Sequence, residues 1–335
     1  MILVTGGTGL VGSHLLVRLC ENQHQIRATY RAKESISKCQ NVFEIQGKSA
    51  LFQNIEWVYA DIEDYFSVKD ALQGIDYVYH LAAVVSFDAK RSNEMMKANI
   101  EGTANVVNAS LEQGIKKLCY VSSVAALGEY EGNKCTDEEA LWQKNEFTSD
   151  YSISKYYAEN EVWRASEEGL NSVVVNPATI IGFGDWTESS STIIRKVAKG
   201  LRFYPPGTNG FVGVDDVVKA IILLMESSIS HERFILVSEN LSFKTILSTI
   251  AKGLNKKAPS IKVSKSIANL LQYLDQLRAF LFGSPLTLTK QTIQTSFSDR
   301  CYSSEKLKKA LANFKFEPME ESILKACKLY SKESD

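Results

Sequence analysis

A glycine-rich turn near the N-terminus constrains this chain more than any other stretch. The segment Thr5–Gly12 reads Thr-Gly-Gly-Thr-Gly-Leu-Val-Gly, follows a short apolar run and precedes a helical pattern from Ser13 to Cys20. Gly6 permits a tight turn, Gly9 lets the backbone approach a pyrophosphate, and Gly12 lets the helix pack close to the strand. This strand–turn–helix context predicts a dinucleotide site at the positive end of the helix. Its candidate cofactor-binding residues are Gly6, Thr8, Gly9, Leu10, Val11 and Gly12.

The length and composition of the chain indicate which domain organisation, binding partners and cellular location to expect. The 335 residues suit one large α/β domain with a C-terminal lobe, or two closely joined domains. The net charge of −1 gives no reason to expect nucleic acid or a membrane as a partner, and apolar runs such as Ala220–Met225 are too short to span a bilayer. The first residues already read as a strand, so no signal peptide is expected. Scattered cysteines without a Cys-x-x-Cys pair predict reduced, mostly buried thiols and a cytoplasmic location.

Hydrophobic patterns predict an alternation of strands and helices along most of the chain. The predicted strands are Ile2–Val4, Gln25–Tyr30, Ile55–Ala60, Asp76–Leu81, Leu118–Val121, Ser172–Val175 and Arg233–Val237. The predicted helices, besides the first, are Val68–Leu72, Glu94–Gln113, Val217–Met225, Met319–Tyr330 and one beginning at Tyr151.

Residues after the second and third predicted strands concern the adenosine end of a dinucleotide. Sites selective for NAD often carry an acid after the second strand, whereas this chain has Arg31 with Lys33 close by. Cations there pair with a 2′-phosphate, so we predict NADP as the cofactor, with NAD as the alternative and a solvated Arg31 as the simpler interpretation. Asp61 and Ile62 follow the third strand, and Asp61 is expected to bond the adenine amino group, to cap a helix, or to do both.

The fourth and fifth predicted strands end in small or polar residues. Leu81–Ala83 let the chain pass close to the cofactor ribose, while His80 is predicted to be a packed strand-end residue rather than a base. Asn99 lies in a long helix, either on a partly exposed face or bonding across the cofactor pocket. Ser122 and Ser123 follow the fifth strand, and open α/β sheets place their chemistry at such carboxyl ends.

Tyr151 and Lys155 lie one turn apart on the same face of a predicted helix. A free tyrosine has a pKa of about 10 and is a poor acid–base group at neutral pH. A lysine ammonium beside the phenol, together with a cationic nicotinamide, stabilises the phenolate and lowers that pKa. The hydroxyl of Ser123 then holds the substrate oxygen while Tyr151 gives or takes its proton.

These motifs together resemble the extended short-chain dehydrogenase/reductases, also called the NAD-dependent epimerase/dehydratase family. The resemblance covers at least residues 1–220 and, more loosely, Tyr302–Pro318. Its motifs are Thr5–Gly12, Asp61-Ile62, His80–Ala83, Asn99 with Gly102-Thr103, Val121–Gly128, Tyr151 with Lys155, Asn176-Pro177 with Gly182, and Phe211–Asp216.

The resemblance implies a Rossmann-type, doubly wound parallel sheet with a small, mostly helical C-terminal lobe. The dinucleotide-binding domain would be residues 1–180, with 211–240 returning to it, and the substrate-binding lobe 181–210 and 241–335. Ser123, Tyr151, Lys155 and Asn99 would be the catalytic residues, with Lys155 also binding the nicotinamide ribose. Cofactor contacts would also come from Arg31, Lys33, Asp61, Ile62, Leu81, Ala82, Ala83, Ser122, Asn176 and Pro177.

The sequence of the segment from Asn176 to Gly182 resembles that of dihydroflavonol-reductase-like and hydroxysteroid-dehydrogenase-like members more than that of sugar epimerases. Epimerases commonly carry an arginine before the motif at Phe211 that grips a nucleotide diphosphate, and this chain has none there. A buried diphosphate requires cationic partners, so this departure disfavours a nucleotide sugar. Other arginines remain candidates for that task, namely Arg195, Arg202 and Arg300.

Three functional hypotheses follow. The first is an NADP-dependent reductase or dehydrogenase acting on a mid-sized organic molecule; the second is a nucleotide-sugar epimerase or dehydratase with tightly held NAD; the third is a non-catalytic NADP-binding regulator. No metal is expected, because Asp215 and Asp216 read as a helix N-cap and its neighbour. An apolar helix over 270–282 is assigned to the pocket wall and core or to a partner surface, and a homodimer is possible in this family.

Overall fold

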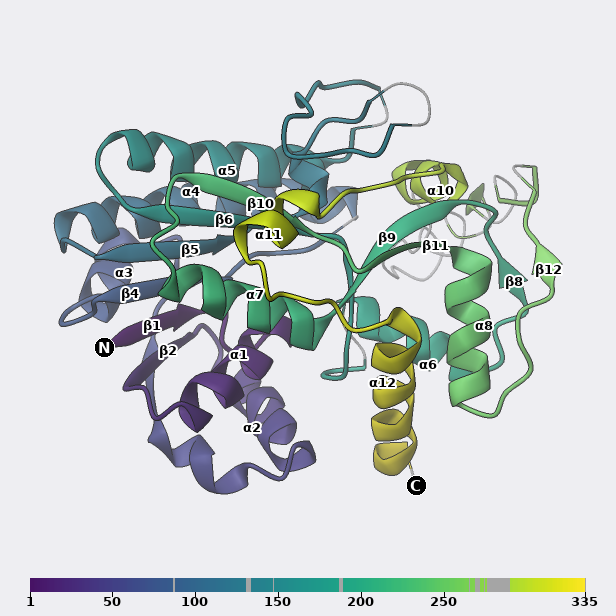
Figure 1. Ribbon diagram of the computed structural model, residues 1–335, viewed down its shortest axis with the longest axis horizontal. Coiled ribbons are helices and arrows are strands. Elements are labelled where there is room, and N and C mark those ends of the chain that lie inside the picture. Colours follow the sequence, from purple (N-terminus) through teal and green to yellow (C-terminus); the bar gives the residue numbers. More distant parts are fainter. Residues whose placement is uncertain are drawn as a thin grey trace.

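Seven parallel strands form the central sheet of the part of the chain that the structure describes (Figure 1). The computed structural model describes residues 1–86, 88–130, 134–146, 148–186, 189–264, 266–268, 272–273, 275 and 290–334. The sheet consists of β1 (Ile2–Thr5), β2 (Ile26–Tyr30), β3 (Ile55–Tyr59), β4 (Tyr77–His80), β5 (Lys117–Val121), β6 (Ser172–Pro177) and β10 (Glu232–Leu236). Their order, β10-β6-β5-β4-β1-β2-β3, reverses direction between β1 and β4. Doubly wound sheets bind ligands at the carboxyl ends of the strands beside such a reversal.

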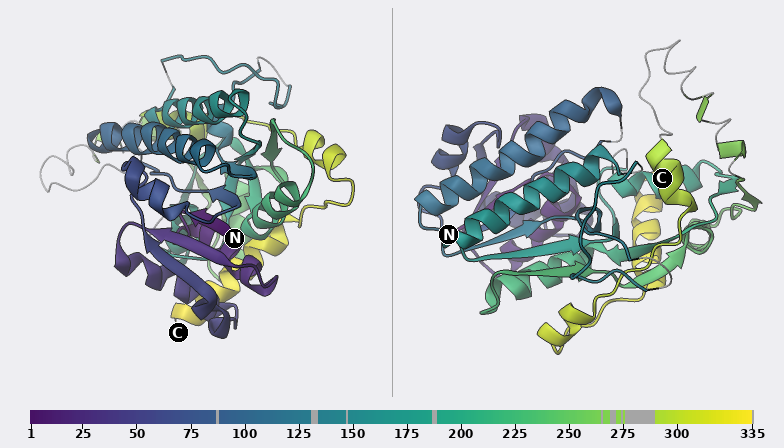
Figure 2. Two further views of the ribbon diagram at one scale, coloured as in Figure 1. Left: turned by 90° about the vertical axis from the view of Figure 1, so that its left-hand side faces the viewer. Right: turned by 90° about the horizontal axis from the view of Figure 1, so that it is seen from above.

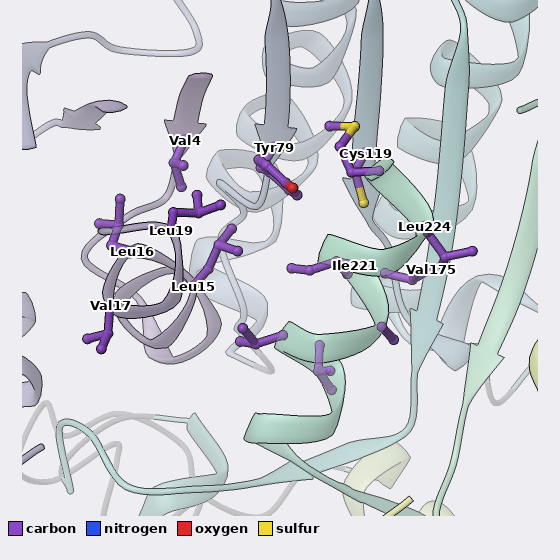
Figure 3. Packing of buried hydrophobic residues seen from close by; sticks show 14 of the residues in the cluster. Val4, Leu15, Leu16, Val17, Leu19, Tyr79, Cys119, Val175, Ile221 and Leu224 are labelled. Carbon is purple, nitrogen blue, oxygen red and sulfur yellow. The ribbon is translucent and has the colours of Figure 1, made fainter. Parts of the chain in front are cut away.

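Helices cover both faces of this sheet (Figure 2). One layer contains α1 (Leu10–Glu21), α2 (Ile36–Ile45) and α7 (Val214–Glu226), and the other contains α3 (Tyr65–Ala71), α4 (Ser92–Glu112) and α5 (Asp150–Glu167). Figure 3 shows the first layer, where Leu15 and Leu19 of α1 and Ile221 of α7 lie beneath Val4 and Tyr79 of the sheet. Strands covered on both faces must be apolar throughout, which explains the continuous hydrophobic runs in the sequence.

Most of the remaining elements gather at one end of the sheet, on the right of Figure 1. They are β7 (Thr179–Ile181), α6 (Thr192–Ala198), β8 (Phe203–Tyr204), β9 (Thr208–Gly213), β11 (Glu239–Ser242), α8 (Phe243–Gly253), β12 (Ile261–Lys262), α10 (Lys290–Phe297) and α12 (Met319–Ser334). Helix α11 (Glu305–Ala310) lies instead beside β10. Strand β9 pairs with β7 and β11 in a small sheet, and β8 pairs with β12. A separate apolar cluster joins α6, α8 and α12, so this end of the molecule has a core of its own.

The helix-cap interpretation of Asp61 is wrong. Helix α3 begins only at Tyr65, and its cap is Asp64, whose carboxylate accepts the backbone N–H of Phe66 at 3.1 Å. Asp61 instead accepts the backbone N–H of Glu63 within the turn after β3. The sequence placed the start of this helix too late, so the nearer acid was not recognised as the cap.

The predicted cap at Asp215 and Asp216 is also wrong. Gly213 precedes α7, and both acids lie inside its first turn, where the helix dipole stabilises a carboxylate. Asp216 is buried and accepts the backbone N–H of Glu317 at 2.9 Å. Burial raises the pKa of Asp216 to about 6. Within the described ranges, no group of three or more His, Cys, Asp or Glu side chains is arranged to hold a metal ion.

One pair of cysteines departs from the predicted reduced state. Cys135 and Cys301 form a disulfide across 166 positions of the sequence. The backbones beside them are aligned, because the N–H of Thr136 donates to the carbonyl of Cys301 at 2.8 Å and Thr136 pairs with Tyr302 as a parallel bridge. Four other cysteines are buried free thiols, as predicted: Cys20, Cys39, Cys119 and Cys327. Spacing in the sequence carries no information about this long-range alignment.

Loss of this disulfide is expected to destabilise the fold. Because the bond closes a very long loop of the unfolded chain, Cys135→Ser should lower the free energy of unfolding by about 2–4 kcal/mol, measured by urea denaturation without reductant. Dithiothreitol should lower the melting temperature of the original chain and leave that of Cys135→Ser unchanged. Equal melting temperatures with and without reductant, or six reactive thiols in the unreduced denatured chain instead of four, would contradict this bond.

Two further predictions concern an apolar helix of the C-terminal lobe and the absence of a membrane-spanning helix. The apolar residues of the helix expected over 270–282 fall outside the described residues, namely Leu270, Leu271, Leu274, Leu277, Phe280, Leu281 and Phe282, as does its Gly283-Ser284-Pro285 stop. Among helices of the described part, none combines the length and the apolar composition that crossing a bilayer requires.

Candidate active site

The glycine turn between β1 and α1 is shaped by close backbone contacts. Gly6 has a positive φ of 70°, and a Cβ there would lie 2.7 Å from the backbone nitrogen of Ala82. A Cβ on Gly12 would lie 2.1 Å from the carbonyl oxygen of Gly6. The turn is therefore packed against both the start of α1 and the segment after β4, and larger residues have no room at these two positions.

A cavity of about 420 Å³ opens over this turn. Four residues predicted to bind a cofactor line it: Thr8, Gly9, Leu10 and Ala83. The remaining lining residues are Ser13, Lys38, Val42, Val84, Val85, Arg91, Gly184, Asp185 and Ser191. The cavity thus combines a helix N-terminus with two cationic side chains, which suits a ligand carrying phosphate groups.

The basic residues of the cavity differ from those named from the sequence. Arg31 and Lys33 are exposed and lie outside its lining, whereas Lys38 from α2 lines it and pairs with Asp185 at 3.0 Å. The hydrogen bond from Arg91, with a smaller contribution from the charge of Arg31, lowers the pKa of Glu94. The position of Lys38 depends on the register of α2, which the sequence analysis did not define, so the sequence could not show which lysine faces the turn.

Ser123 and Tyr151 are brought together at the carboxyl end of β5. The Oγ of Ser123 accepts the backbone N–H of Ala125 at 3.1 Å, which caps a short 3₁₀ helix over Val124–Ala126. The hydroxyl of Ser123 also forms a hydrogen bond with the phenol of Tyr151. Burial raises the pKa of Tyr151, and the bond from Ser123 lowers it. Burial has the larger effect, so the pKa of Tyr151 is raised in the chain by itself. The sequence predicted a lowered pKa with the nicotinamide bound.

Lys155 is buried beneath this pair. Its Nζ donates to the phenol of Tyr120 and to the backbone carbonyl of Val121, both at 2.9 Å. Only 2% of Lys155 is exposed, and burial lowers its pKa to about 7, while the charge of Glu159 raises it. The ammonium is therefore anchored to β5 just before Ser122 and Ser123.

The side-chain amide of Asn99 makes three hydrogen bonds, two to the backbone and one to a side chain. Its amide oxygen accepts the N–H of Val84 at 2.7 Å, and its amide nitrogen donates to the carbonyl of Val84 at 2.9 Å and to the hydroxyl of Ser154 at 2.9 Å. Ser154 in turn donates to the carbonyl of Tyr151. Asn99 thus connects the segment at Val84, which lines the cavity, to the first turn of α5.

His80 is a packed strand-end residue, as predicted. It is 0% exposed, and its ring nitrogens lie 2.7 Å from the hydroxyl of Thr5 and 3.0 Å from that of Thr103. Burial, with a smaller contribution from the charge of Lys155, lowers the pKa of His80 to about 3. A neutral imidazole held on both sides joins β1, β4 and α4 behind the glycine turn.

Two buried polar atoms test whether a dinucleotide fits here. The hydroxyl of Ser122 and the amide oxygen of Asn176 are buried at the ends of β5 and β6 with no hydrogen-bond partner among the described residues. Buried polar groups are nearly always satisfied, so these two atoms indicate a polar ligand at the strand ends. With the glycine turn and the cationic cavity, the residues present fit an extended dinucleotide.

Comparison with known proteins identifies the family. The profile of the NAD dependent epimerase/dehydratase family matches residues 2–237, which include the whole central sheet as far as β10. The chain belongs to this family. It is an NAD(P)-dependent oxidoreductase of the extended short-chain dehydrogenase type, as the sequence motifs implied.

Similar members of the family include several reductases. The chain is 33% identical over 247 residues to tetraketide alpha-pyrone reductase 2 of Arabidopsis thaliana, covering 70% of this chain and 76% of that one. It is 28% identical to a putative dihydroflavonol 4-reductase of Synechocystis, covering 90% and 87%. Among solved structures, gox2253 shares 29% identity with a TM-score of 0.80, covering 99% and 98%. UDP-glucose 4-epimerase of Thermotoga maritima has the same TM-score at 20% identity, covering 100% and 99%, and so shows a shared fold.

Proposed function

We propose that this family member is an NADPH-dependent reductase, reversible as a dehydrogenase, for a carbonyl or secondary alcohol of a mid-sized organic molecule. The contact between Ser123 and Tyr151, with Lys155 anchored beneath it, carries the proposal. The reductases among its relatives support the same reaction type.

Each side chain has one task in this proposal. The nicotinamide, when bound, supplies or accepts the hydride. Tyr151 transfers a proton to or from the substrate oxygen, and Ser123 donates a hydrogen bond to that oxygen. The Ser123 oxygen accepts the N–H of Ala125, and its hydroxyl, which bonds to Tyr151 in the chain by itself, would donate to the substrate oxygen instead. Lys155 stabilises the phenolate, and Asn99 positions α5 and the segment at Val84.

An activity assay tests the proposal against its rivals. Purified protein is mixed with NADPH and a panel of aryl ketones and dihydroflavonols, or with UDP- and dTDP-sugars, and absorbance at the NADPH band is followed. We expect NADPH consumption with a ketone, and a melting temperature raised more by NADP than by NAD. Conversion of a nucleotide sugar without net NADH release would establish the epimerase hypothesis instead. Cofactor binding without turnover of any compound would favour a regulator.

The preference for NADP is proposed to depend on the cations beside the cavity. Lys38→Met should raise the dissociation constant of NADPH at least about tenfold and leave that of NADH within about twofold, because a charge-assisted bond to the 2′-phosphate is lost. Fluorescence titration with both cofactors measures this. Arg31→Met is expected to act in the same direction.

Lys33→Met is the matched control, because Lys33 is an exposed lysine outside the cavity. An equal effect of Lys38→Met on NADPH and NADH would show that Lys38 acts on a group shared by both cofactors. An effect of Lys33→Met equal to that of Lys38→Met would return the role to the residue named from the sequence.

The domain division and the setting of the enzyme belong to the same proposal. Residues 1–180 and 211–240 would bind the cofactor, and 181–210 with 241–335 would bind the substrate. A cytoplasmic location is proposed as well, although disulfides such as Cys135–Cys301 are rare there. Alkylation of cells before lysis shows whether the bond is present, and light scattering shows whether two copies associate.

A further inference from the structure

A buried carboxylate lies one helical turn beyond Lys155. Glu159 is 2% exposed, and its oxygens accept hydrogen bonds from three groups on three elements. The amide of Asn176 donates at 2.8 Å, the guanidinium of Arg233 at 3.2 Å and the indole of Trp163 at 3.3 Å. The three donors fix the position of the carboxylate, and one of them is a cation that offsets the cost of burying it.

This cluster reaches the catalytic serine through Asn176. The same amide nitrogen that donates to Glu159 also donates to the backbone carbonyl of Ser123 at 3.1 Å. Arg233 of β10 also donates to the carbonyl of Glu138, whose carboxylate accepts the N–H of Ile235 at 2.8 Å. The carboxylate of Glu159 therefore connects α5 to the edge strand β10 and, through Asn176, to the segment that carries Ser123.

Glu159 is also the acid closest in helical register to Lys155. Residues four apart share one face of a helix, so both side chains point from α5 toward β5 and β6. Around Lys155, β4 contributes His80, which stays neutral, and β5 contributes Tyr120, whose pKa is raised by burial. The other charged groups of the cluster are Arg233 from β10 and Glu138 from the preceding loop. Glu159 is thus the group that offsets the positive charge of Lys155.

We propose that Glu159 is a positioning residue of the active site: its buried carboxylate, held by Arg233 and Asn176, keeps Lys155 in the ammonium form and fixes the backbone of Ser123. The inference rests on the proposed function for its catalytic consequence. The coupling between the two charges is independent of it and is a property of the chain alone.

The test measures the protonation of Lys155 directly in the cofactor-free protein. Protein labelled with [ε-¹³C]lysine is titrated between about pH 5 and 10 by NMR, and the Lys155 signal is assigned by its loss in Lys155→Arg. Glu159→Gln removes the charge with little change in shape, and we expect the midpoint of the Lys155 titration to fall by at least about one pH unit, a tenfold change in the equilibrium. Arg233→Gln removes the opposing charge and should raise the midpoint.

Control variants separate charge from packing. Glu161→Gln changes an acid on the same helix that pairs with Arg164 near the surface, and should leave the Lys155 midpoint unchanged. Arg233→Lys keeps the charge and should stay near the original value. An unchanged midpoint in Glu159→Gln, or shifts of the same sign in Glu159→Gln and Arg233→Gln, would overturn the proposal. Should Glu159→Gln not fold, the direction of the Arg233→Gln shift decides alone.

The catalytic consequence is measured separately, as the pH profile of kcat/KM for NADPH-dependent reduction. A lower Lys155 midpoint leaves less ammonium at a given pH, so in Glu159→Gln activity should decline at a lower pH than in the original chain. A purely structural role would reduce activity equally at every pH. If no substrate is reduced by the original chain, the proposed function fails while the NMR result stands.

Discussion

Replacing Tyr151 with phenylalanine is expected to reduce carbonyl turnover at least about a hundredfold while leaving the dissociation constant of NADPH within about twofold. A positioned acid–base group contributes about 10²–10⁴ to the rate, and the phenol of Tyr151 is the group that Ser123 contacts at the end of β5. Phenylalanine keeps the ring and removes only the proton-transferring oxygen. Steady-state kinetics with NADPH and a reducible ketone, together with cofactor titration, provide the measurement.

Tyr157→Phe is the matched control for this prediction. Tyr157 lies on the same helix with 48% of its side chain exposed, so removal of its hydroxyl should leave kcat and KM unchanged. Turnover of Tyr151→Phe close to that of the original chain would refute the assigned acid–base role. A loss of NADPH binding in the same variant would show that Tyr151 supports the fold of the site instead.

The second large effect is expected at the glycine turn. Gly12→Ala places a Cβ 2.1 Å from the carbonyl oxygen of Gly6 and 2.8 Å from the Cα of Gly7, and these backbone atoms cannot rotate away as a side-chain tip can. The turn must shift, so the N–H groups that face a pyrophosphate lose their alignment. We expect NADPH affinity to fall at least about a hundredfold, and overpacking to lower the free energy of unfolding by about 1–3 kcal/mol.

Gly9→Ala separates ligand contact from packing. A Cβ on Gly9 meets only the Gly6 oxygen at 3.4 Å, which is an ordinary contact. This variant should therefore keep the melting temperature of the original chain and still bind NADPH more weakly, because the methyl group stands where the backbone approaches the pyrophosphate. If Gly12→Ala binds NADPH normally, or Gly9→Ala unfolds as readily as Gly12→Ala, the packing described for this turn is wrong.

The central sheet was predictable because its signals are local and repeated. The predicted strands of the sheet coincide with observed strands to within two residues at either end, since runs buried on both faces leave a clear hydrophobic pattern. The helix-cap assignment at Asp61 failed because a later acid, Asp64, caps α3, and that at Asp215–Asp216 failed because α7 already begins at Val214. Backbone geometry at the first turn decides which residue is the cap, and the sequence does not contain it.

In the candidate site, too, some features were predictable from the sequence and others were not. The pairing of Ser123 with Tyr151 agrees with the family pattern, since Ser123 follows β5 and Tyr151 lies in the first turn of α5, two elements whose positions the sequence indicated. Lys38 was not identified, because its position in the cavity depends on the register of α2. The predicted lowering of the Tyr151 pKa does not occur in the chain alone, because burial opposes it and the Lys155 ammonium bonds to β5.

By itself the sequence determined the glycine turn, the strands of the parallel sheet and the Tyr151–Lys155 face of α5. Each of these leaves a pattern among residues that are close together in the sequence. Tertiary structure alone decided the disulfide between Cys135 and Cys301 and the contact of Glu159 with Arg233, whose partners are 166 and 74 residues apart. Contacts at such separations arise from the packing of whole elements, which no local pattern specifies.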